Sequence, residues 1–249
     1  MNMKRQTEFE LRKISSRVFD KSTLMTLYTL TRRNSINEIV SIVSTGKEAN
    51  VYYGIGGNEE VAIKIYAIET SDFKTMDKYI RGDIRFGEWK NRRQLIFNWA
   101  KKEFKNLSRI YKKVKCPRPI DVENNVLVME FIGEGGIPAP RMKDLPPDDP
   151  EKYFNLILRY IHEMYSLGIV HGDLSEYNIL NWNEPVIIDL SMGVLKSHPL
   201  ADELLMRDIT RICNYFKKFG IESNALEIFN SVKHKDAKEN CGEDNRKGA

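Results

Sequence analysis

The sequence contains little cysteine and no long apolar run. Its three cysteines, Cys116, Cys213 and Cys241, lie far apart and form no C-x-x-C pair. This spacing excludes a disulfide scaffold and a zinc site with four cysteine ligands, and it suits a reducing compartment. The longest apolar runs are only a few residues, whereas a helix that spans a bilayer needs roughly 20. No apolar stretch follows Lys4-Arg5 as it would in a secretory signal, so we expect a cytoplasmic globular protein with no membrane partner.

Charge is plentiful but unevenly placed. Of the 249 residues, 30% are charged and 41% are hydrophobic, which favours one large or two small domains with a buried core over wholesale disorder. The net charge is +4, and residues 101–118 concentrate lysine and arginine against a single acid, Glu103. This basic stripe is either an electrostatic footprint for a phosphate-rich partner or a solvated helix face, and both interpretations stay open.

Hydrophobic periodicity predicts a helix, then a β-rich region, then a mainly helical region. The β-rich region begins near Ile39 and includes a hairpin that turns at Gly56-Gly57-Asn58. Residues 133–150 are rich in proline and glycine and are expected to join two lobes. Helices are expected over residues 8–33, 95–111, 150–168 and 201–219, strands over residues 51–53, 61–66, 126–132 and 186–189, and a mobile or partly helical connection over residues 69–94.

The predicted fold class is therefore α+β. We expect an N-terminal helical extension at residues 1–38 and a two-lobed domain at residues 39–232, followed by a charged, flexible tail at residues 233–249. The β-rich N-lobe is expected at about residues 39–132 and the helical C-lobe at about residues 133–232.

A lysine and a glutamate stand where apolar residues are expected. Lys64 lies within the apolar strand V-A-I-K-I-Y, where a buried ammonium needs a partner. Glu103 lies on the apolar stripe of the helix expected over residues 95–111. The two side chains could form the strand-lysine to helix-glutamate pair that holds nucleotide phosphates in protein kinases. Two simpler interpretations stay open: Lys64 reaches water from an edge strand, or Glu103 pairs locally with Lys102 or Lys105.

The octapeptide H-G-D-L-S-E-Y-N at residues 171–178 follows the catalytic-loop pattern H-R-D-L-x-x-x-N, with Gly172 in place of the arginine. In this pattern Asp173 accepts or orients the hydroxyl proton of the phosphate acceptor, and Asn178 binds a magnesium ion. Each residue type is common in loops, but this spacing directly after a capped helix is specific. Asp208, beside the apolar stripe of the next long helix, is expected to anchor the loop.

A further acidic residue, Asp189, ends the apolar strand that follows this loop. Leu190-Ser191 stand after it, where the usual metal-binding triplet has Phe-Gly. An isolated aspartate at the end of a strand is more often a turn cap. Because magnesium prefers a few carboxylate oxygens together with substrate phosphates, Asp189 beside the preceding motif is predicted to bind the metal.

The glycine-rich loop G-x-G-x-x-G is missing before Lys64. The equivalent stretch, S-T-G-K-E-A-N-V-Y at residues 44–52, has one glycine, and Glu48 after Gly46-Lys47 breaks the Walker pattern. Its hydroxyl groups and backbone amides can still cradle phosphates.

Taken together, residues 44–52 and 171–178 closely resemble the nucleotide loop and the catalytic loop of the RIO family of atypical serine/threonine protein kinases, in its first subgroup. Asp189, followed by His198-Pro199, is similar to that family's metal segment. The resemblance covers roughly residues 20–230. One departure is Leu-Ser-Met-Gly after Asp189, where the subgroup commonly has a Ser-Gln pair, so a role for glutamine is not carried over to Met192.

The resemblance implies a bilobal kinase-like fold with a reduced C-lobe and extra N-terminal helices. It implies ATP with Mg²⁺, or Mn²⁺ as a substitute, a protein substrate or self-phosphorylation, and a role in maturation of the small ribosomal subunit precursor. An acyl phosphate would form on Asp189. Lys64, Asp173 and Asp189 are the implied catalytic residues, and Asn178 and Asp189 the implied metal ligands. The implied ATP contacts are Ser44, Thr45, Lys47, Glu48, Asn50, Val51, Lys64, Glu103, Asn178 and the adenine-binding hinge residues Met129, Glu130 and Ile132.

The sequence lacks motifs that ordinary kinases use to bind the protein that accepts the phosphate. No Ala-Pro-Glu follows Asp189, and Ser175 stands where ordinary serine/threonine kinases place a lysine near the transferred phosphate. Three functions stay open: an atypical kinase, an ATPase that assembles RNA and protein, and a small-molecule phosphotransferase of the aminoglycoside or choline type, which also carries His-Gly-Asp-Leu. The stretch at residues 44–52 argues against the third.

Overall fold

The computed structural model describes residues 19–68 and 73–244. The chain divides into two compact units, one formed by Met1–Ser108 with Pro117–Pro138 and the other by Arg109–Cys116 with Ala139–Ala249. The first unit is rich in strands and the second is mainly helical, as the α+β prediction requires. No helix in the described ranges has both the length and the apolar character needed to cross a membrane.

The first unit is built on a five-stranded antiparallel sheet in the order β1-β2-β3-β5-β4. The predicted hairpin is confirmed: β2 and β3 pair along their whole length, and the turn between them uses the left-handed backbone of Gly57 (φ 58°). The strands are β1 (Glu38–Thr45), β2 (Ala49–Gly56), β3 (Glu59–Tyr66), β4 (Pro119–Glu123) and β5 (Val126–Glu130), followed by the small hairpin of β6 (Gly133–Glu134) and β7 (Ile137–Pro138).

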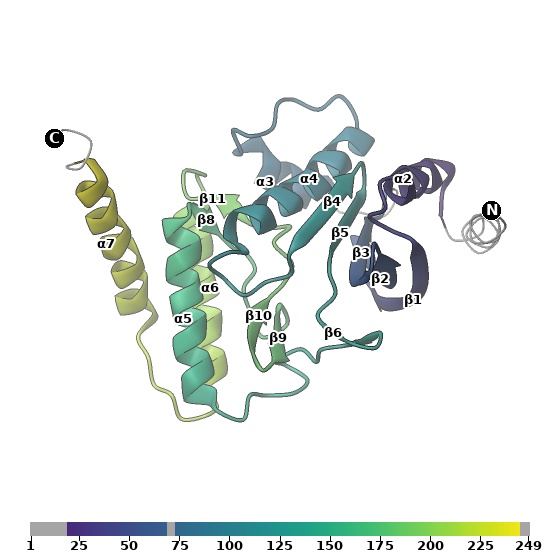
Figure 1. Cartoon of the computed structure of the whole chain (residues 1–249). Coiled ribbons are helices and arrows are strands. Elements are labelled where there is room, and N and C mark those ends of the chain that lie inside the picture. The colour runs from purple at the N-terminus through teal and green to yellow at the C-terminus, as the bar shows by residue number, and fades with distance from the viewer. Residues whose placement is uncertain (1–18, 69–72, 245–249) are drawn as a thin grey trace. The chain divides into compact units, whose positions relative to one another are not determined.

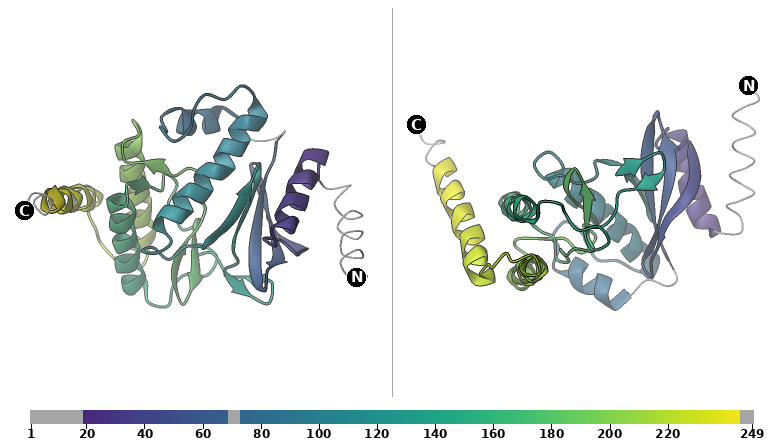
Figure 2. Two further views of the ribbon diagram at one scale, coloured as in Figure 1. Left: turned by 45° about the horizontal axis from the view of Figure 1, so that its top comes forward. Right: turned by 90° about the horizontal axis from the view of Figure 1, so that it is seen from below.

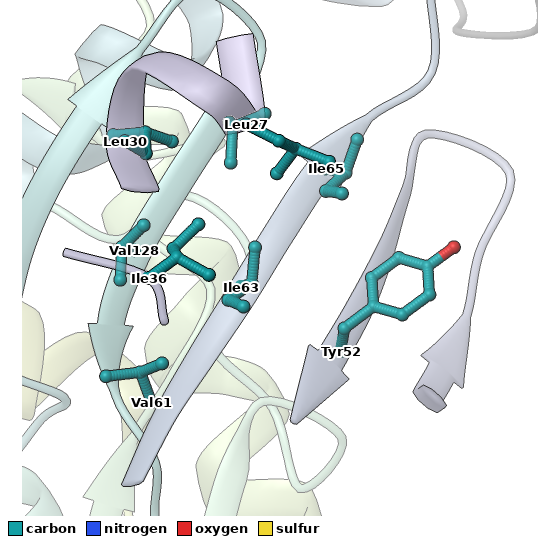
Figure 3. Close-up of a cluster of buried hydrophobic side chains, with 9 residues drawn as sticks. Leu27, Leu30, Ile36, Tyr52, Val61, Ile63, Ile65 and Val128 are labelled. Atoms are coloured by element: carbon teal, nitrogen blue, oxygen red, sulfur yellow. The ribbon is translucent and has the colours of Figure 1, made fainter. Parts of the chain in front are cut away.

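Helix α2 (Lys21–Arg32) covers one face of this sheet and α4 (Arg92–Ile110) lies on the other, as Figure 2 shows. Figure 3 shows Leu27 and Leu30 of α2 packed with Ile63 and Ile65 of β3 and with Val128 of β5. Because side chains alternate across a strand, the residue between Ile63 and Ile65 faces the opposite side, toward α4.

Two helix starts differ from the sequence prediction for the same reason. Within the described residues, the helix expected over residues 8–33 begins at Lys21, because Asp20 caps it by accepting from the N–H groups of Ser22 and Thr23. The part expected over residues 8–18 lies outside the described residues. Helix α4 begins before the expected residue 95, because Asn91 Oδ1 accepts from the N–H of Gln94 at 3.0 Å. Within the expected connection, α3 (Phe73–Arg81) is helical, and residues 69–72 are not described.

The second unit is built around α5 (Pro150–Ser166) and α6 (Ala201–Lys217), which lie side by side (Figure 1) and join through the rings of Phe154 and Phe216, 5.3 Å apart. The predicted start of α5 is confirmed, because Asp149 accepts from Lys152 N–H at 2.9 Å and Pro150 occupies the first turn. Short strand pairs flank these helices: β8 (Ile169–Val170) with β11 (Val194–Leu195), and β9 (Ile179–Trp182) with β10 (Glu184–Ile187).

The C-terminal helix reaches into the charged stretch that was expected as a flexible tail at residues 233–249. Helix α7 (Ala225–Asp244) includes residues 233–244, and residues 245–249 are not described. This helix contacts α5 and α6, with Val232 buried and Lys233 Nζ 2.5 Å from Asp202 Oδ2. These contacts stabilise a helix that its composition alone does not predict.

Candidate active site

The first unit holds a buried ion pair between β3 and α4. Lys64 Nζ lies 3.0 Å from Oε1 and 2.9 Å from Oε2 of Glu103, and the two side chains are only 8% and 0% exposed. Tyr66, two residues along the same face of β3, also donates its hydroxyl to Glu103 Oε2. The predicted pairing is confirmed, and the edge-strand interpretation is wrong because β3 is the central strand of the sheet.

Three of the predicted ATP-binding residues of this unit, Val51, Lys64 and Met129, share one face of the sheet. Val51 of β2 and Leu127 of β5 lie directly opposite Lys64, and Met129 lies opposite Ala62. Because cross-strand partners share a face, these side chains lie on the Lys64 face, away from the α2 core.

The nucleotide-loop residues form the turn between β1 and β2 and its flanking positions. Ser44 pairs with Val51, and Thr45 pairs with Asn50, whose Oδ1 accepts from Gly46 N–H at 3.3 Å. A Cβ at Gly46 would meet the Ala49 carbonyl oxygen at 2.9 Å, which explains the single glycine of this stretch. Lys47 and Glu48 complete the turn.

The expected hinge begins at the end of β5. Glu130 N–H donates to the Arg118 carbonyl at 2.9 Å, and Glu130 Oε2 accepts from Arg118 N–H at 3.0 Å. Because this N–H is engaged within the sheet, a nucleotide contact from the Glu130 backbone would have to use the carbonyl oxygen. Ile132 lies just beyond the strand.

The basic stripe is divided between the two units, and one of its members is not at the surface. Lys102 is fully buried, and its ammonium lies 4.8 Å from the Trp99 ring centre and 6.0 Å from that of Tyr79. Lys101 and Lys105 remain exposed on α4 in the first unit, whereas residues 109–116 belong to the second.

In the second unit, the catalytic loop between β8 and β9 is fixed by one buried carboxylate. Asp208 of α6 accepts from the N–H groups of Gly172 at 2.7 Å and Leu174 at 3.0 Å. The predicted anchoring role of Asp208 is confirmed. Arg207, its neighbour on α6, donates to the Gly172 carbonyl oxygen. Burial raises the pKa of Asp208 from its usual 3.8 to about 7, although the two backbone donors oppose this shift.

Gly172 stands where the kinase pattern has arginine, and the backbone explains the difference. Its φ of 78° lies in the left-handed region, and a Cβ at this position would come within 2.8 Å of the Met192 carbonyl oxygen. The path of the loop therefore leaves no room for any side chain at position 172.

The predicted catalytic and metal-binding residues of this unit lie close together. Asn178 Nδ2 donates to the Asp173 backbone carbonyl at 2.8 Å and to its Oδ2 at 3.1 Å. The Asn178 carbonyl in turn accepts from Ile188 N–H at 3.0 Å, so Asn178 lies beside the residue that precedes Asp189. Since Nδ2 is committed to Asp173, the remaining Oδ1 of Asn178 is the atom that can bind a hard cation.

Asp189 adopts a left-handed backbone with φ of 60°, which is uncommon outside glycine and most tolerated by asparagine and aspartate. Its Oδ1 accepts from the Ser191 hydroxyl at 2.6 Å and from Ser191 N–H at 3.3 Å. A carboxylate and an amide oxygen suit the few protein ligands that Mg²⁺ takes.

The sequence did not point to three polar partners: Tyr66, Ser191 and Arg211. Arg211 of α6 donates from Nη1 to Asp173 Oδ1 at 2.6 Å. Its one available signal was its position three residues after Asp208, which places both on one face of α6.

Comparisons with known proteins agree with these motifs. The RIO domain family model matches residues 50–228. The RIO-type serine/threonine-protein kinase Rio1 of Methanocaldococcus jannaschii is 45% identical over 227 residues, covering 90% of this chain and 78% of that protein. The Rio1 kinase of Haloferax volcanii is 36% identical over 236 residues, covering 93% and 81%.

A solved structure of the Rio2 kinase from Chaetomium thermophilum, in an ADP/Mg²⁺-phosphoaspartate complex, superposes with a TM-score of 0.66 at 21% identity. The match covers 84% of this chain and 66% of that one. It confirms the predicted kinase-like α+β fold.

Glu103→Gln removes the negative charge from an ion pair that hardly meets solvent. Because the Lys64 ammonium then stays buried without a full countercharge, we expect the free energy of unfolding to fall by about 3–5 kcal/mol in denaturant titrations. Glu59→Gln is the matched control, because Glu59 pairs with Arg118 at an exposed site, where a pair contributes about 0–1 kcal/mol. Lys64→Met combined with Glu103→Leu should restore most of the loss. Equal losses for both Glu→Gln variants would contradict the buried pair.

Gly172→Ala adds a methyl group where the Met192 carbonyl stands. We expect a loss in unfolding free energy of about 1–2 kcal/mol from the left-handed backbone, plus about 1–3 kcal/mol from the steric contact. Gly220→Ala is the control, since Gly220 has φ of 80° but a methyl group added there would meet no atom within 4 Å. Denaturant unfolding should therefore separate the two variants, and losses of the same size would show that the loop yields to the methyl group.

The raised pKa of Asp208 predicts a pH dependence of stability. Because the native carboxyl holds its proton up to about pH 7 and the unfolded one only to about 3.8, the contribution of Asp208 to stability is greatest at low pH and falls as the pH rises from about 4 through 7. Asp208→Asn should lose this slope in urea unfolding measured across that range, and it should also lose one of the two loop hydrogen bonds. Asp202→Asn, on the exposed side of the same helix, should keep the slope. A slope that survives in Asp208→Asn would assign it to another group.

Proposed function

The chain belongs to the RIO domain family, and we propose on this basis that it transfers the γ-phosphate of ATP to serine or threonine hydroxyls, its own included. The observation that carries the proposal is the cluster around Asn178 in the second unit. Its side chain contacts Asp173, and its backbone contacts the residue before Asp189. One segment thus supplies a carboxylate for the acceptor and two oxygen ligands for a cation, in the order of the kinase catalytic loop.

In the first unit, the Lys64 ammonium is proposed to bind the phosphates of ATP. The Glu103 carboxylate holds it in place, so its position does not depend on the nucleotide. The turn at residues 44–52 offers backbone amides and the hydroxyls of Ser44 and Thr45 for further phosphate contacts. Val51 and Met129, on the Lys64 face, and the Glu130 carbonyl with the Ile132 backbone are proposed to receive the adenine ring.

In the second unit, Asn178 Oδ1 and the Asp189 carboxylate are proposed to hold Mg²⁺, with Mn²⁺ as a substitute. When bound, the cation neutralises charge on the phosphate oxygens. Asp173 orients the acceptor hydroxyl and takes its proton. Its own carboxylate is fixed by Asn178 on Oδ2, which leaves lone pairs for the acceptor.

A second candidate activity, ATP hydrolysis through a phosphorylated Asp189, is favoured by the backbone of this residue. Its strained left-handed conformation and the Ser191 hydroxyl on Oδ1 fix the carboxylate in one orientation. The name of the similar Rio2 structure includes a phosphoaspartate. A small-molecule phosphotransferase is not proposed, because the family match is to the RIO domain.

We also propose a small ribosomal subunit precursor as partner and a cytoplasmic location. The exposed basic residues at positions 101–118 support a phosphate-rich partner, with Lys102 excluded because it is buried. The low cysteine content supports the location.

The test is turnover of γ-labelled ATP with Mg²⁺ by the wild type and by Asp189→Asn. Asparagine tolerates the left-handed backbone, so the fold should persist while phosphate transfer falls at least about 100-fold, or roughly 3 kcal/mol. Label in acid-stable esters would establish the kinase reaction, and label in a hydroxylamine-sensitive species would establish the phosphoaspartate. Asp144→Asn, at an exposed ion pair of the same unit, is the control. Equal turnover by Asp189→Asn and the wild type would refute the proposal.

A further inference from the structure

The Asp173 carboxylate pairs with an arginine that lies outside every motif found in the sequence. Arg211, from the middle of α6, places Nη1 2.6 Å from Asp173 Oδ1. The arginine side chain is 41% exposed and the aspartate 39%, so the pair lies at the surface of the second unit, where an acceptor can reach it. Both residues belong to the same compact unit.

Helix α6 contacts the catalytic loop through backbone N–H groups, a backbone carbonyl and a side chain. Asp208 binds two backbone N–H groups of the loop, and Arg207 binds the Gly172 carbonyl. Arg211 binds the Asp173 side chain itself. Because Asp208 and Arg211 are three residues apart, one face of the helix fixes both the backbone of the loop and the carboxylate of Asp173.

The two oxygens of the Asp173 carboxylate have different donors. Asn178 Nδ2 binds Oδ2 at 3.1 Å, and Arg211 Nη1 binds Oδ1 at 2.6 Å. Two donors on opposite oxygens leave little freedom for the carboxylate to rotate about χ2. A carboxylate accepts about four hydrogen bonds, so an acceptor hydroxyl still finds a lone pair.

The catalytic loop itself, residues 171–178, contains no lysine or arginine. Gly172 replaces the arginine of the kinase pattern and has no room for a side chain, and position 175 is serine. The guanidinium beside the carboxylate therefore comes from a helix 38 residues further along the chain.

We infer that Arg211 is a positioning residue for phosphate transfer: it fixes the Asp173 carboxylate in the orientation that receives the acceptor hydroxyl. This inference rests on the proposed function. It assigns α6 a part in the chemistry beyond anchoring the loop backbone, and it predicts that the effect of Arg211 passes through Asp173 alone.

The test is a double-mutant cycle between Arg211→Gln and Asp173→Asn, with γ-labelled ATP and Mg²⁺. We expect Arg211→Gln to lower kcat for transfer to hydroxyl groups about 10- to 100-fold and to leave KM for ATP within about twofold. Arg211→Lys should recover part of the rate, because it restores the charge without the planar fork. In the Asp173→Asn background, Arg211→Gln should lower the residual rate no further. Lys217→Gln, an exposed cation on the same helix, should match the wild type.

Three results would overturn the inference: a loss in the Asp173→Asn background as large as in the wild type, a rate for Arg211→Gln equal to that of Lys217→Gln, or a rate above the wild type. The last would mean that Arg211 blocks the acceptor. If the wild type shows no turnover, the proposed function fails. The same cycle, measured by denaturant unfolding, then decides whether Arg211 and Asp173 interact. If the losses in unfolding free energy of the two single variants add up to that of the double variant, the two residues do not interact.

Discussion

The second unit depends on a single requirement, that the buried amides of an irregular loop find an acceptor. The catalytic loop has no strand or helix partner for the N–H groups of Gly172 and Leu174, and Asp208 accepts from both. Removing that carboxylate would leave two buried donors unsatisfied. The neighbouring contacts, from Asn178 to Asp173 and onward to Ile188, presuppose the loop path that Asp208 fixes.

In the first unit, the alternation of side chains along one strand separates the apolar core from the buried ion pair. Val61, Ile63 and Ile65 of β3 enter the core beneath α2, while Lys64 and Tyr66 turn to Glu103 on α4. A shift of one residue in the β2–β3 register would bring the lysine into the apolar core and the isoleucines toward the glutamate. The hairpin turn at Gly57 therefore secures the ion pair as well as the fold.

Features that contrast with their surroundings were predictable from sequence. Glu103 was found because a carboxylate on an apolar helix stripe needs a cation, and Asp208 because it stands beside such a stripe. Arg211 was not predicted, because an arginine on a helix is usually exposed to solvent and its presence there does not indicate a partner. Helical structure at residues 233–244 was not predicted, because a charged composition favours fraying, whereas the same helix is held to its unit by the buried Val232 and by the pair of Lys233 with Asp202. Short strands such as β8 and β11 exist only through pairing between distant segments.

The close approach of Met192 to Gly172 also limits how this enzyme could be redesigned. Introducing the arginine of conventional kinases at position 172 would force the segment after Asp189 to move, and that segment follows directly on the carboxylate proposed to bind the metal. A designer who wants to strengthen or reverse the charge beside Asp173 therefore has to work from α6, where position 211 can be varied without touching the backbone of either loop.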